Sequence, residues 1–297
     1  MKVVVTGTSG RVGRAIHFTL CQQHEVVGID QSPASSTSNV GDIRDADFLK
    51  RSFYGANSVI HAAALHAPHV GRVSDKQFQI INVDATARIA ELAKFSGVKK
   101  LVFTSTTALY GSVTDNRDAA AWINEYTTPE PVTIYHKTKL EAENLLQSEA
   151  CENFSVVVLR LSKCFPEPAP QMSIYRMHRG VDARDVARGH ELAMLTEGSV
   201  FRRYILSGKT PFMRTDCKEL KHDAKSVIRS CCSSIFADFA NRGWELPEAI
   251  DRVYDSSKAI KELAWNPRYG ALNVLRLYDE GHSEVLPPQA IDSNISE

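Results

Sequence analysis

Short apolar, β-branched runs alternate with longer stretches in which apolar residues recur at every third or fourth position across the first 160 residues. The short runs are typical of buried strands and the longer ones of amphipathic helices, so the alternation predicts βαβ units around a parallel sheet. The predicted strands are Lys2 to Thr6, Glu25 to Ile29, Ser58 to His61, Lys100 to Thr104 and Ser155 to Leu161. The predicted helices are Gly10 to Gln22, Asp45 to Phe53, Asp75 to Ser96 and Tyr135 to Cys151. The pattern therefore predicts the α/β class with a doubly wound parallel sheet.

The pattern changes after Leu161. Three prolines are expected to break any helix that begins there: Pro166, Pro168 and Pro170. A helix is predicted from about Asp185 to Glu197 and a strand from Arg203 to Leu206, and the polar tail from about Ser283 is expected to fray. We therefore expect a sheet domain over residues 1–160 and a small mixed α/β cap over 161–297, partly interleaved with the first and carrying the substrate site.

Composition excludes several classes of function. The chain has 297 residues, of which 43% are hydrophobic, and 35 basic residues balance 35 acidic ones. A net charge of zero does not give the electrostatic footprint of a protein that binds nucleic acid or an anionic membrane, so we expect a small-molecule ligand. The six cysteines are scattered without metal-ligand spacing, which predicts idle thiols and no metal site. No leader-like N-terminus or apolar run of about 20 residues occurs, so a cytoplasmic location is expected.

A glycine-rich turn directly follows the first predicted strand, in the run Thr6-Gly7-Thr8-Ser9-Gly10-Arg11-Val12-Gly13. A strand before this pattern and a helix inside it are the context that a dinucleotide-binding fingerprint requires. Gly7 allows the tight turn, Gly10 lets the backbone approach a pyrophosphate, and Gly13 lets the helix pack against the strand. The sequence thus predicts a Rossmann-type site at a helix N-terminus, where free N–H groups favour phosphate.

Asp30 strengthens this prediction, because it ends the second strand where a carboxylate accepts hydrogen bonds from the adenosine ribose hydroxyls. The same carboxylate repels a 2′-phosphate, so NAD is predicted rather than NADP. Arg11 and Arg14 lie near enough in sequence to leave some support for a 2′-phosphate. Asp42 and Ile43 are placed to flank the adenine.

Tyr135 and Lys139 lie one turn apart on one predicted helix face. A free tyrosine with a pKa near 10 is a poor base at neutral pH, and a fixed ammonium beside it favours the phenolate. The spacing alone is weak evidence, because Tyr254 and Lys258 repeat it. Tyr135 follows the fourth predicted strand, at the sheet edge where α/β sites form, whereas Tyr254 is expected at a helix entry with a structural role.

A hydroxyl-rich run from Thr104 to Gly111 follows the fourth predicted strand at the same edge. A hydroxyl there is placed to bond the substrate oxygen while Tyr135 moves its proton. On its own the run is typical of strand-end capping. Together with the glycine turn and Tyr135 it completes a candidate site.

With these residues in order, the chain resembles the extended short-chain dehydrogenase/reductase superfamily, in its NAD-dependent epimerase/dehydratase group. The resemblance spans nearly the whole chain, and its motifs include His61-Ala62-Ala63-Ala64 and Asn82. It implies Thr106, Tyr135 and Lys139 as the catalytic set, and a homodimer formed through the helices 75–96 and 135–151. The residues assigned to the cofactor are Gly7, Ser9, Gly10, Arg11, Val12, Gly13, Asp30, Asp42, Ile43, His61, Ala62, Ala63, Asn82, Tyr135 and Lys139.

Departures from the family pattern narrow the expected chemistry. Sugar-nucleotide dehydratases of this family carry an Asp-Glu pair after the catalytic Thr, where this chain has Thr107-Ala108, so dehydration is not expected. Only a short interval separates Arg160 from Asp182, which leaves little room for a nucleotide sugar. That interval resembles uronate dehydrogenases in its C-x-P-E-P turn and Tyr-Arg-Met. The resemblance implies substrate contacts from His66, Thr106, Thr107 and Arg176, although a salt bridge is an equally weighted explanation of Arg176.

The sequence therefore predicts an enzyme, an NAD-dependent oxidoreductase that moves hydride between NAD and a carbohydrate-like hydroxy compound such as a sugar or uronic acid. Two alternatives stay open. One is a nucleotide-sugar epimerase or reductase on the same fold. The other is an NAD-binding regulator without turnover, which the complete Thr106, Tyr135 and Lys139 set disfavours, because a sensor needs no tuned phenolate.

Overall fold

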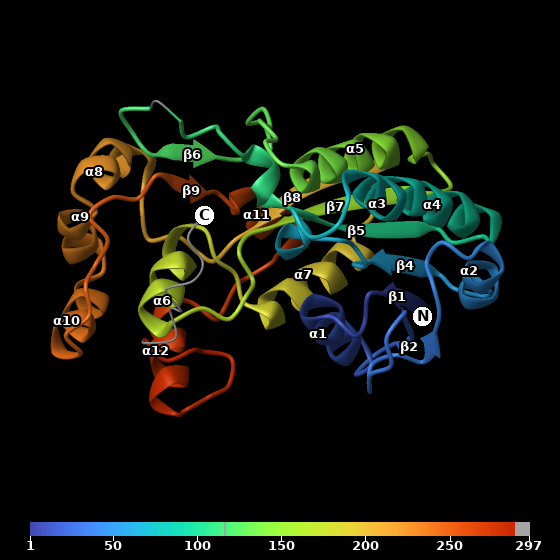
Figure 1. Ribbon diagram of the computed structural model, residues 1–297, viewed down its shortest axis with the longest axis horizontal. Coiled ribbons are helices and arrows are strands. Elements are labelled where there is room, and N and C mark those ends of the chain that lie inside the picture. Colours follow the sequence, from blue (N-terminus) through green and yellow to red (C-terminus); the bar gives the residue numbers. More distant parts are fainter. Residues whose placement is uncertain (116, 289–297) are drawn as a thin grey trace.

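The computed structural model describes residues 1–115 and 117–288 (Figure 1). Within these residues seven parallel strands form one sheet in the order β3-β2-β1-β4-β5-β7-β8. Their bounds are β1 Lys2–Thr6, β2 Glu25–Asp30, β3 Asn39–Val40, β4 Ser58–His61, β5 Lys100–Thr106, β7 Ser155–Leu161 and β8 Phe201–Leu206. The order reverses between β1 and β4, so the loops that leave β1 and β4 meet at one edge. The predicted doubly wound α/β sheet is confirmed.

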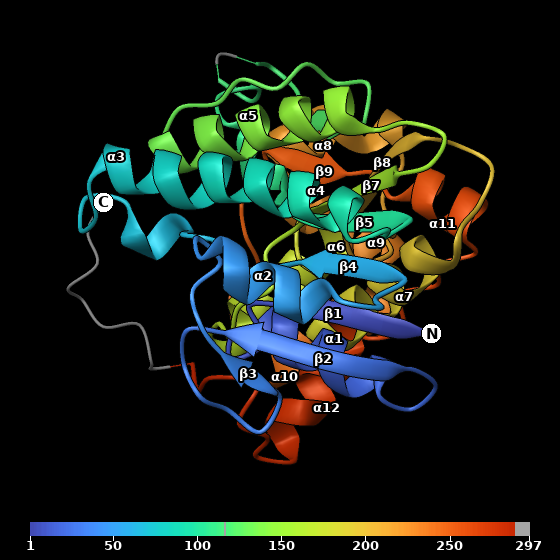
Figure 2. The same ribbon diagram turned by 90° about the vertical axis from the view of Figure 1, so that its right-hand side faces the viewer.

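Two helical layers cover the sheet (Figures 1 and 2). One face packs against α1 (Arg11–Leu20), α7 (Ala183–Leu195) and α11 (Ser257–Leu263). The other face packs against α2 (Ala46–Phe53), α4 (Ala85–Phe95) and α5 (Ile134–Glu149). The central strands are buried on both faces and are mainly apolar, as β1 illustrates, since Val3, Val4 and Val5 are fully buried.

Side-chain caps set where these helices begin. The Asp45 carboxylate accepts hydrogen bonds from the backbone N–H groups of Asp47 and Phe48 at the start of α2. Thr133 and His136 form a reciprocal capping box at the start of α5. These bonds satisfy N–H groups that have no partner inside the helix. The helix that carries Tyr135 thus has a fixed first turn.

A smaller cap lies beyond the carboxyl ends of the strands, opposite the chain's N-terminus in Figure 1. It contains a two-stranded parallel sheet of β6 (Ala121–Ile123) and β9 (Arg252–Tyr254). Its helices are α6 (Ala169–His178), α8 (Cys217–His222), α9 (Ala224–Cys231), α10 (Ser233–Asn241) and α12 (Ala271–Asp279). An apolar cluster with Ile174, Leu220, Ile228 and Phe239 holds these elements together.

The structure alters several local expectations. Strand β8 and helix α7 follow residue 160 yet complete the main sheet and its helical layer, while β6 precedes it and belongs to the cap. The prolines around 166–170 do not exclude a helix, because α6 begins at Ala169 with Pro170 in its first turn, where a proline lacks no needed N–H. Tyr254 lies in β9 rather than at a helix entry. The long helix predicted from Asp75 is interrupted by a π-helical turn, Ile80–Asp84, between α3 (Asp75–Gln79) and α4.

The described part of the C-terminal segment packs against α6 and α12. Leu286 accepts a backbone hydrogen bond from Ala169 and donates one to Glu167, and Val285 is buried against α6 and α12. The tail expected to fray from Ser283 is therefore packed through these residues, and the rest of it lies outside the described residues. All six cysteines fall within the described ranges and are free thiols. Among the described helices none is both long enough and apolar enough to cross a bilayer.

Trp265 packs the C-terminal part of the chain against α7. We predict that Trp265→Ala lowers the free energy of unfolding by about 3–5 kcal/mol. The indole is fully buried, and its Nε1 donates a 2.9 Å hydrogen bond to the Asp185 carbonyl. Urea unfolding measures the loss, with Trp265→Phe as the control that keeps most of the apolar volume. A loss within about 1 kcal/mol of wild type would contradict this packing role.

Candidate cofactor and catalytic site

The glycine turn has no room for side chains at two of its positions. Gly7 has φ of 77°, in the left-handed region, and a Cβ there would lie 2.7 Å from the Ala63 nitrogen. A Cβ on Gly13 would lie 2.1 Å from the Gly7 carbonyl oxygen, so only glycine lets α1 start this close to β1. The N-terminus of α1 thereby faces the sheet edge with Gly10 as its cap. A backbone cradle at a helix N-terminus fits the pyrophosphate of a dinucleotide.

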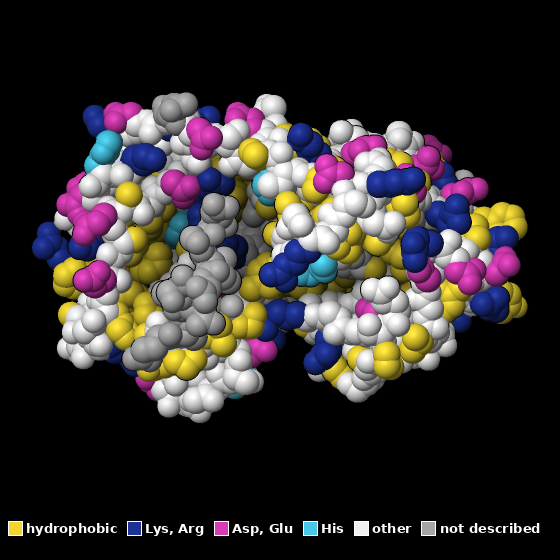
Figure 3. All heavy atoms as spheres, viewed as in Figure 1, with side chains coloured by type: hydrophobic (Ala, Val, Ile, Leu, Met, Phe, Trp, Pro, Cys, Tyr) yellow, Lys and Arg dark blue, Asp and Glu magenta, His cyan; other side chains and the backbone are white. Residues whose placement is uncertain are grey.

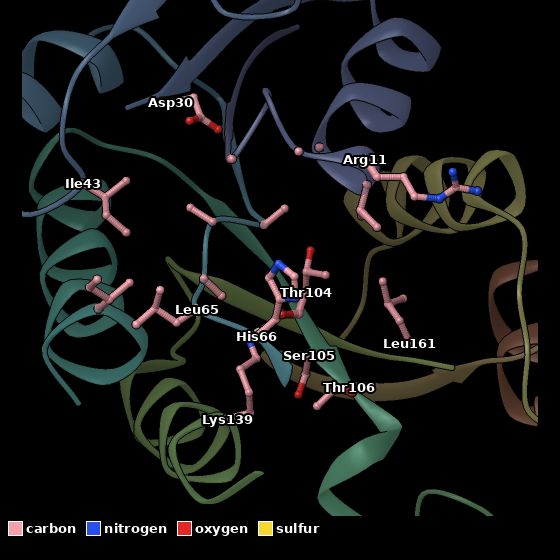
Figure 4. Close-up of a pocket in the computed structure, with 18 of the residues that line it drawn as sticks. Arg11, Asp30, Ile43, Leu65, His66, Thr104, Ser105, Thr106, Lys139 and Leu161 are labelled. Carbon is pink, nitrogen blue, oxygen red and sulfur yellow. Dashed lines mark hydrogen bonds between the residues drawn. The ribbon is translucent and has the colours of Figure 1, made fainter. Parts of the chain in front are cut away.

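A cavity of about 420 Å³ runs from this turn along the carboxyl edge of the sheet. Figure 4 shows Asp30 near one end of it and Thr106 and Lys139 near the other. The predicted site residues that line it are Gly7, Gly10, Arg11, Val12, Gly13, Asp30, Asp42, Ile43, Ala62, Ala63, His66, Thr106, Tyr135 and Lys139. The fold has thus gathered into one cavity residues that span more than 130 positions of the chain.

Asp30 stands at the end of β2 with its carboxylate at the cavity wall. Its Oδ2 accepts a 3.0 Å hydrogen bond from the Ser9 nitrogen, and its Oδ1 accepts a 2.9 Å bond from the Ser32 nitrogen. These bonds fix the orientation of a carboxylate that has further lone pairs to offer to ribose hydroxyls. The placement fits the adenosine half of NAD.

Arg11 does not serve the adenosine end. Figure 4 shows its side chain pointing away from Asp30. Its Nε donates a 2.8 Å hydrogen bond to the Cys164 carbonyl, and its guanidinium forms an ion pair with Glu284. Arg14 is also engaged, because its Nη2 donates to the Ser9 carbonyl oxygen. Arg11 is therefore directed away from a 2′-phosphate, whereas the Arg14 guanidinium keeps its charge beside the Ser9 carbonyl.

Asp42 and Arg44 form the outer wall at the adenosine end. The Arg44 Nε lies 3.0 Å from both carboxylate oxygens of Asp42, and this pairing lowers the pKa of Asp42. Arg44 was not anticipated from the sequence, although a cation two residues after the predicted Asp42 is a local clue. Its planar guanidinium, held by the carboxylate, is a suitable surface for an adenine ring.

Tyr135, Lys139 and Thr106 meet at the far end of the cavity. The Lys139 Nζ donates a 2.7 Å hydrogen bond to the Thr104 carbonyl and lies 3.9 Å from the centre of the Phe103 ring. Burial lowers the pKa of Lys139 to about 7, although the negative charge of Glu143 acts to raise it. Burial raises the pKa of Tyr135 to about 12, against a hydrogen bond with Thr106. The protein alone thus leaves Tyr135 protonated, and ionising it requires added positive charge at this end of the cavity.

Two predicted cofactor residues lie behind the wall rather than in it. His61 is buried, with its Nδ1 2.8 Å from the Thr6 hydroxyl and its Nε2 2.9 Å from the Thr86 hydroxyl. Burial lowers its pKa to about 3, so the ring is neutral. Because the Thr6 hydroxyl accepts hydrogen bonds from the Ala62 and Ala63 nitrogens, His61 helps to hold the loop after β4 in place.

Asn82 supports the same loop from the π-helical turn. Its Oδ1 accepts a 2.8 Å hydrogen bond from the Leu65 nitrogen, and its Nδ2 donates to the Leu65 carbonyl and to the Thr138 hydroxyl. The amide therefore joins a cavity loop to α5, the helix that carries Tyr135. Its role is to position the walls, and a π turn at such a place is a common feature of functional sites.

Three further predicted residues do not line the cavity within the described structure. The Ser9 side chain bonds the Ser32 carbonyl, and its backbone serves Asp30. Thr107 is buried, with its hydroxyl donating to the Leu161 carbonyl. Arg176 is 2% exposed, and its Nη2 donates a 3.1 Å hydrogen bond to Asp182. The salt-bridge explanation of Arg176 is thus the one that the structure has.

His66, the remaining predicted substrate residue, lies in the wall with its ring stacked on Phe165, the two centroids 5.9 Å apart. Its backbone nitrogen donates to the His69 Nδ1. The His66 Nδ1 is buried and has no hydrogen-bond partner among the described residues. The cavity is also lined by Thr104 and Ser105 of the predicted hydroxyl-rich run and by Ala64 of the His61–Ala64 motif. The lining residues to which sequence reasoning assigned no site role are Gln31, Gly41, Arg44, Leu65, Ile81, Leu161, Ser162, Cys164 and Phe165.

Comparison with known proteins agrees with this arrangement. Residues 3–207 match the model of the NAD dependent epimerase/dehydratase family. UDP-glucose 4-epimerase of Streptomyces lividans is 27% identical over 218 residues, which cover 69% of this chain and 62% of that protein. L-arabinose 1-dehydrogenase (NAD(P)(+)) of Haloferax volcanii is 31% identical over 110 residues, 37% of this chain and 42% of that protein. The chain thus spans about two fifths to three fifths of the length of these relatives.

Solved structures share the fold. UDP-glucuronic acid 4-epimerase from Bacillus cereus, in complex with UDP-glucuronic acid and NAD, superposes with a TM-score of 0.68 at 20% identity. The match covers 94% of this chain and 98% of that one. At this identity the likeness concerns the fold, which includes both the sheet and the cap.

We predict that Asp30→Ala weakens NADH binding by about tenfold or more and narrows the preference for NADH over NADPH. The variant loses hydrogen bonds to a charged group, typically about 1.5–3 kcal/mol, together with the repulsion of a 2′-phosphate. Fluorescence titration with both cofactors measures the two affinities, and Asp47→Asn on the exposed side of α2 is the matched control. Unchanged NADH affinity in Asp30→Ala would refute the assignment.

Proposed function

The chain belongs to the NAD-dependent epimerase/dehydratase family, and on this premise we propose that it is a dehydrogenase that oxidises a hydroxyl group of a carbohydrate-like substrate with NAD. The observation that carries the proposal is the meeting of Thr106, Tyr135 and Lys139 at one end of a cavity whose other end holds Asp30. The glycine cradle and Asp30 fit a dinucleotide across the intervening length. When bound, NAD would supply the hydride acceptor and the positive charge of its nicotinamide ring.

In the proposed reaction each side chain has one task. The Thr106 hydroxyl orients the substrate hydroxyl by a hydrogen bond. The Tyr135 oxygen takes the proton of that hydroxyl as the carbon loses its hydride. The Lys139 ammonium supplies positive charge one turn along α5, which favours the phenolate of Tyr135. Hydride and proton thus leave the same alcohol, and a carbonyl compound remains.

A small substrate is supported by the length of the connection between β7 and α7. Over residues 162–182 it holds one helix, α6, and three of its first residues, Ser162, Cys164 and Phe165, line the cavity. Arg176 on α6 pairs with Asp182, which it shares with Arg184, and it does not line the cavity, so a free carboxylate on the substrate is not a requirement of the proposal. We therefore propose sugars, uronic acids and related polyhydroxy compounds as the class to be screened.

A nucleotide-sugar epimerase is the second candidate, and the relatives favour it. The support for a nucleotide sugar comes from the UDP-glucose 4-epimerase described above. A second 4-epimerase, of Escherichia coli O157:H7, acts on N-acetyl-alpha-D-glucosaminyl-diphospho-ditrans,octacis-undecaprenol and is 28% identical over 171 residues, 56% of this chain and 49% of that protein. The same Tyr135 and Thr106 serve such a reaction, in which hydride returns to the substrate. A homodimer through α4 and α5 and a cytoplasmic location stay predictions under either candidate.

Tyr135→Phe is predicted to lower NADH formation at least about 100-fold while leaving NADH affinity within about twofold, because it removes the base and keeps the ring. Absorbance of NADH during a screen of sugars and uronic acids measures turnover, and fluorescence measures affinity. Tyr254→Phe is the matched control, since it makes the same change in the second Tyr-x-x-x-Lys pair. Normal turnover by Tyr135→Phe would contradict the assignment of Tyr135 as the base.

Thermal unfolding separates the two candidates. A ligand that binds the folded state alone raises the melting temperature. We predict that UDP leaves the melting temperature of the NAD-loaded protein unchanged, whereas a substrate sugar at about 100 times its own dissociation constant raises it by a few degrees. Stabilisation by UDP would instead favour the epimerase.

A further inference from the structure

A buried charge cluster lies directly behind the catalytic end of the cavity. Its centre is Glu143 on α5, whose side chain has no exposure to solvent. The Arg160 guanidinium on β7 donates to this carboxylate from Nε at 3.0 Å and from Nη2 at 2.7 Å. Arg203 on β8 places its Nε 2.9 Å from Oε2. The Ser105 hydroxyl on β5 donates a 2.5 Å hydrogen bond to Oε1.

The cluster touches the site at two points. Ser105 lines the cavity between Thr104 and Thr106, so its bond to Glu143 fixes the end of β5. Lys139, which also lines the cavity, lies one turn before Glu143 on the same face of α5. A buried ion pair that serves only stability can be replaced by apolar side chains at little cost. The position of this cluster beside the reacting groups therefore needs another explanation.

The surroundings of Lys139 show why this carboxylate matters. From β5, the Thr104 carbonyl and the Phe103 ring contact its ammonium, and neither carries a charge. From β4, the His61 ring faces it and is neutral. On α5 itself, Tyr135 is protonated in the protein alone. Burial therefore favours loss of the proton from Lys139, and the negative charge of Glu143 favours its retention.

Two arginines act in the opposite sense. Arg160 and Arg203 together carry more positive charge than Glu143 carries negative charge, so the cluster as a whole is cationic. Arg203 is 22% exposed, whereas Arg160 is 1% exposed. Removing the carboxylate leaves both guanidinium groups without the partner they share, and removing Arg203 leaves the carboxylate less neutralised.

We propose that Glu143 is a positioning residue of the reaction, whose carboxylate keeps the Lys139 ammonium charged and, through Ser105, fixes the strand end that carries Thr106. This inference rests on the proposed roles of Lys139 and Thr106. The Lys139 charge is present at pH values below its pKa and is lost as the pH rises through it. Glu143 raises the pH up to which Lys139 stays charged, and Arg203 limits that rise.

The test compares two variants with opposite expected signs. Glu143→Gln is expected to move the titration of Lys139 downward by about one pH unit, and Arg203→Gln is expected to move it upward by a smaller amount. The titration is followed by NMR of protein that carries carbon-13-labelled lysine, because the Cε resonance changes when the Nζ next to it loses its proton. The resonance of Lys139 is the one that disappears in Lys139→Arg.

A merely structural ion pair predicts a different result. Each variant removes one member of the cluster, so both would lower the melting temperature and leave the Lys139 titration unchanged or move it in the same direction. That outcome would overturn the proposal. If Glu143→Gln does not fold, Arg203→Gln decides alone, because an upward shift supports the proposal and no shift or a downward one contradicts it. The measurement needs no turnover, so it stands apart from the test of Tyr135 as the base.

Discussion

The close packing of Gly13 on the Gly7 carbonyl is the constraint on which the rest of the structure depends. It lets α1 start against the carboxyl end of β1, where a Cβ on Gly13 would lie 2.1 Å from that oxygen. Since the strands are all parallel and the order reverses between β1 and β4, the same edge receives the loops after β2, β4, β5 and β7. One cavity then joins a phosphate cradle, the carboxylate of Asp30 and the hydroxyls of Thr106 and Tyr135.

A layer of polar side chains behind this cavity holds its walls. His61 and Asn82 hold the loop after β4, and Glu143 holds the end of β5. Each is buried and fully engaged with groups from other elements, so each has one orientation. Catalytic geometry must be maintained to within about half an ångström, and such buried networks supply that precision. The candidate site therefore depends on residues that no ligand needs to touch.

The parts of the site that the sequence predicted well are those set by local rules. A strand, a glycine turn and a helix start in order specify the cradle, and Asp30 and Tyr135 follow from their distance to strand ends. The orientation of His61, Asn82 and Arg176 was not predictable in this way, because it depends on Thr86, Leu65 and Asp182, which are brought close only by the fold. The placement of β8 in the main sheet likewise depends on its pairing with β7, some 40 residues earlier. Strands β3, β6 and β9 contain two or three residues and are too short to show a period.

A crystal structure of the protein with NADH would show whether one cavity aligns the dinucleotide between Asp30 and the trio of Thr106, Tyr135 and Lys139. We expect the adenosine ribose hydroxyls within hydrogen-bond distance of the Asp30 carboxylate. It also predicts the nicotinamide ring beside Thr106 and Tyr135, with its C4 about 3–4 Å from the space that a substrate carbon would occupy. A nicotinamide ring bound elsewhere, or a dinucleotide in the reverse direction along the cavity, would contradict it.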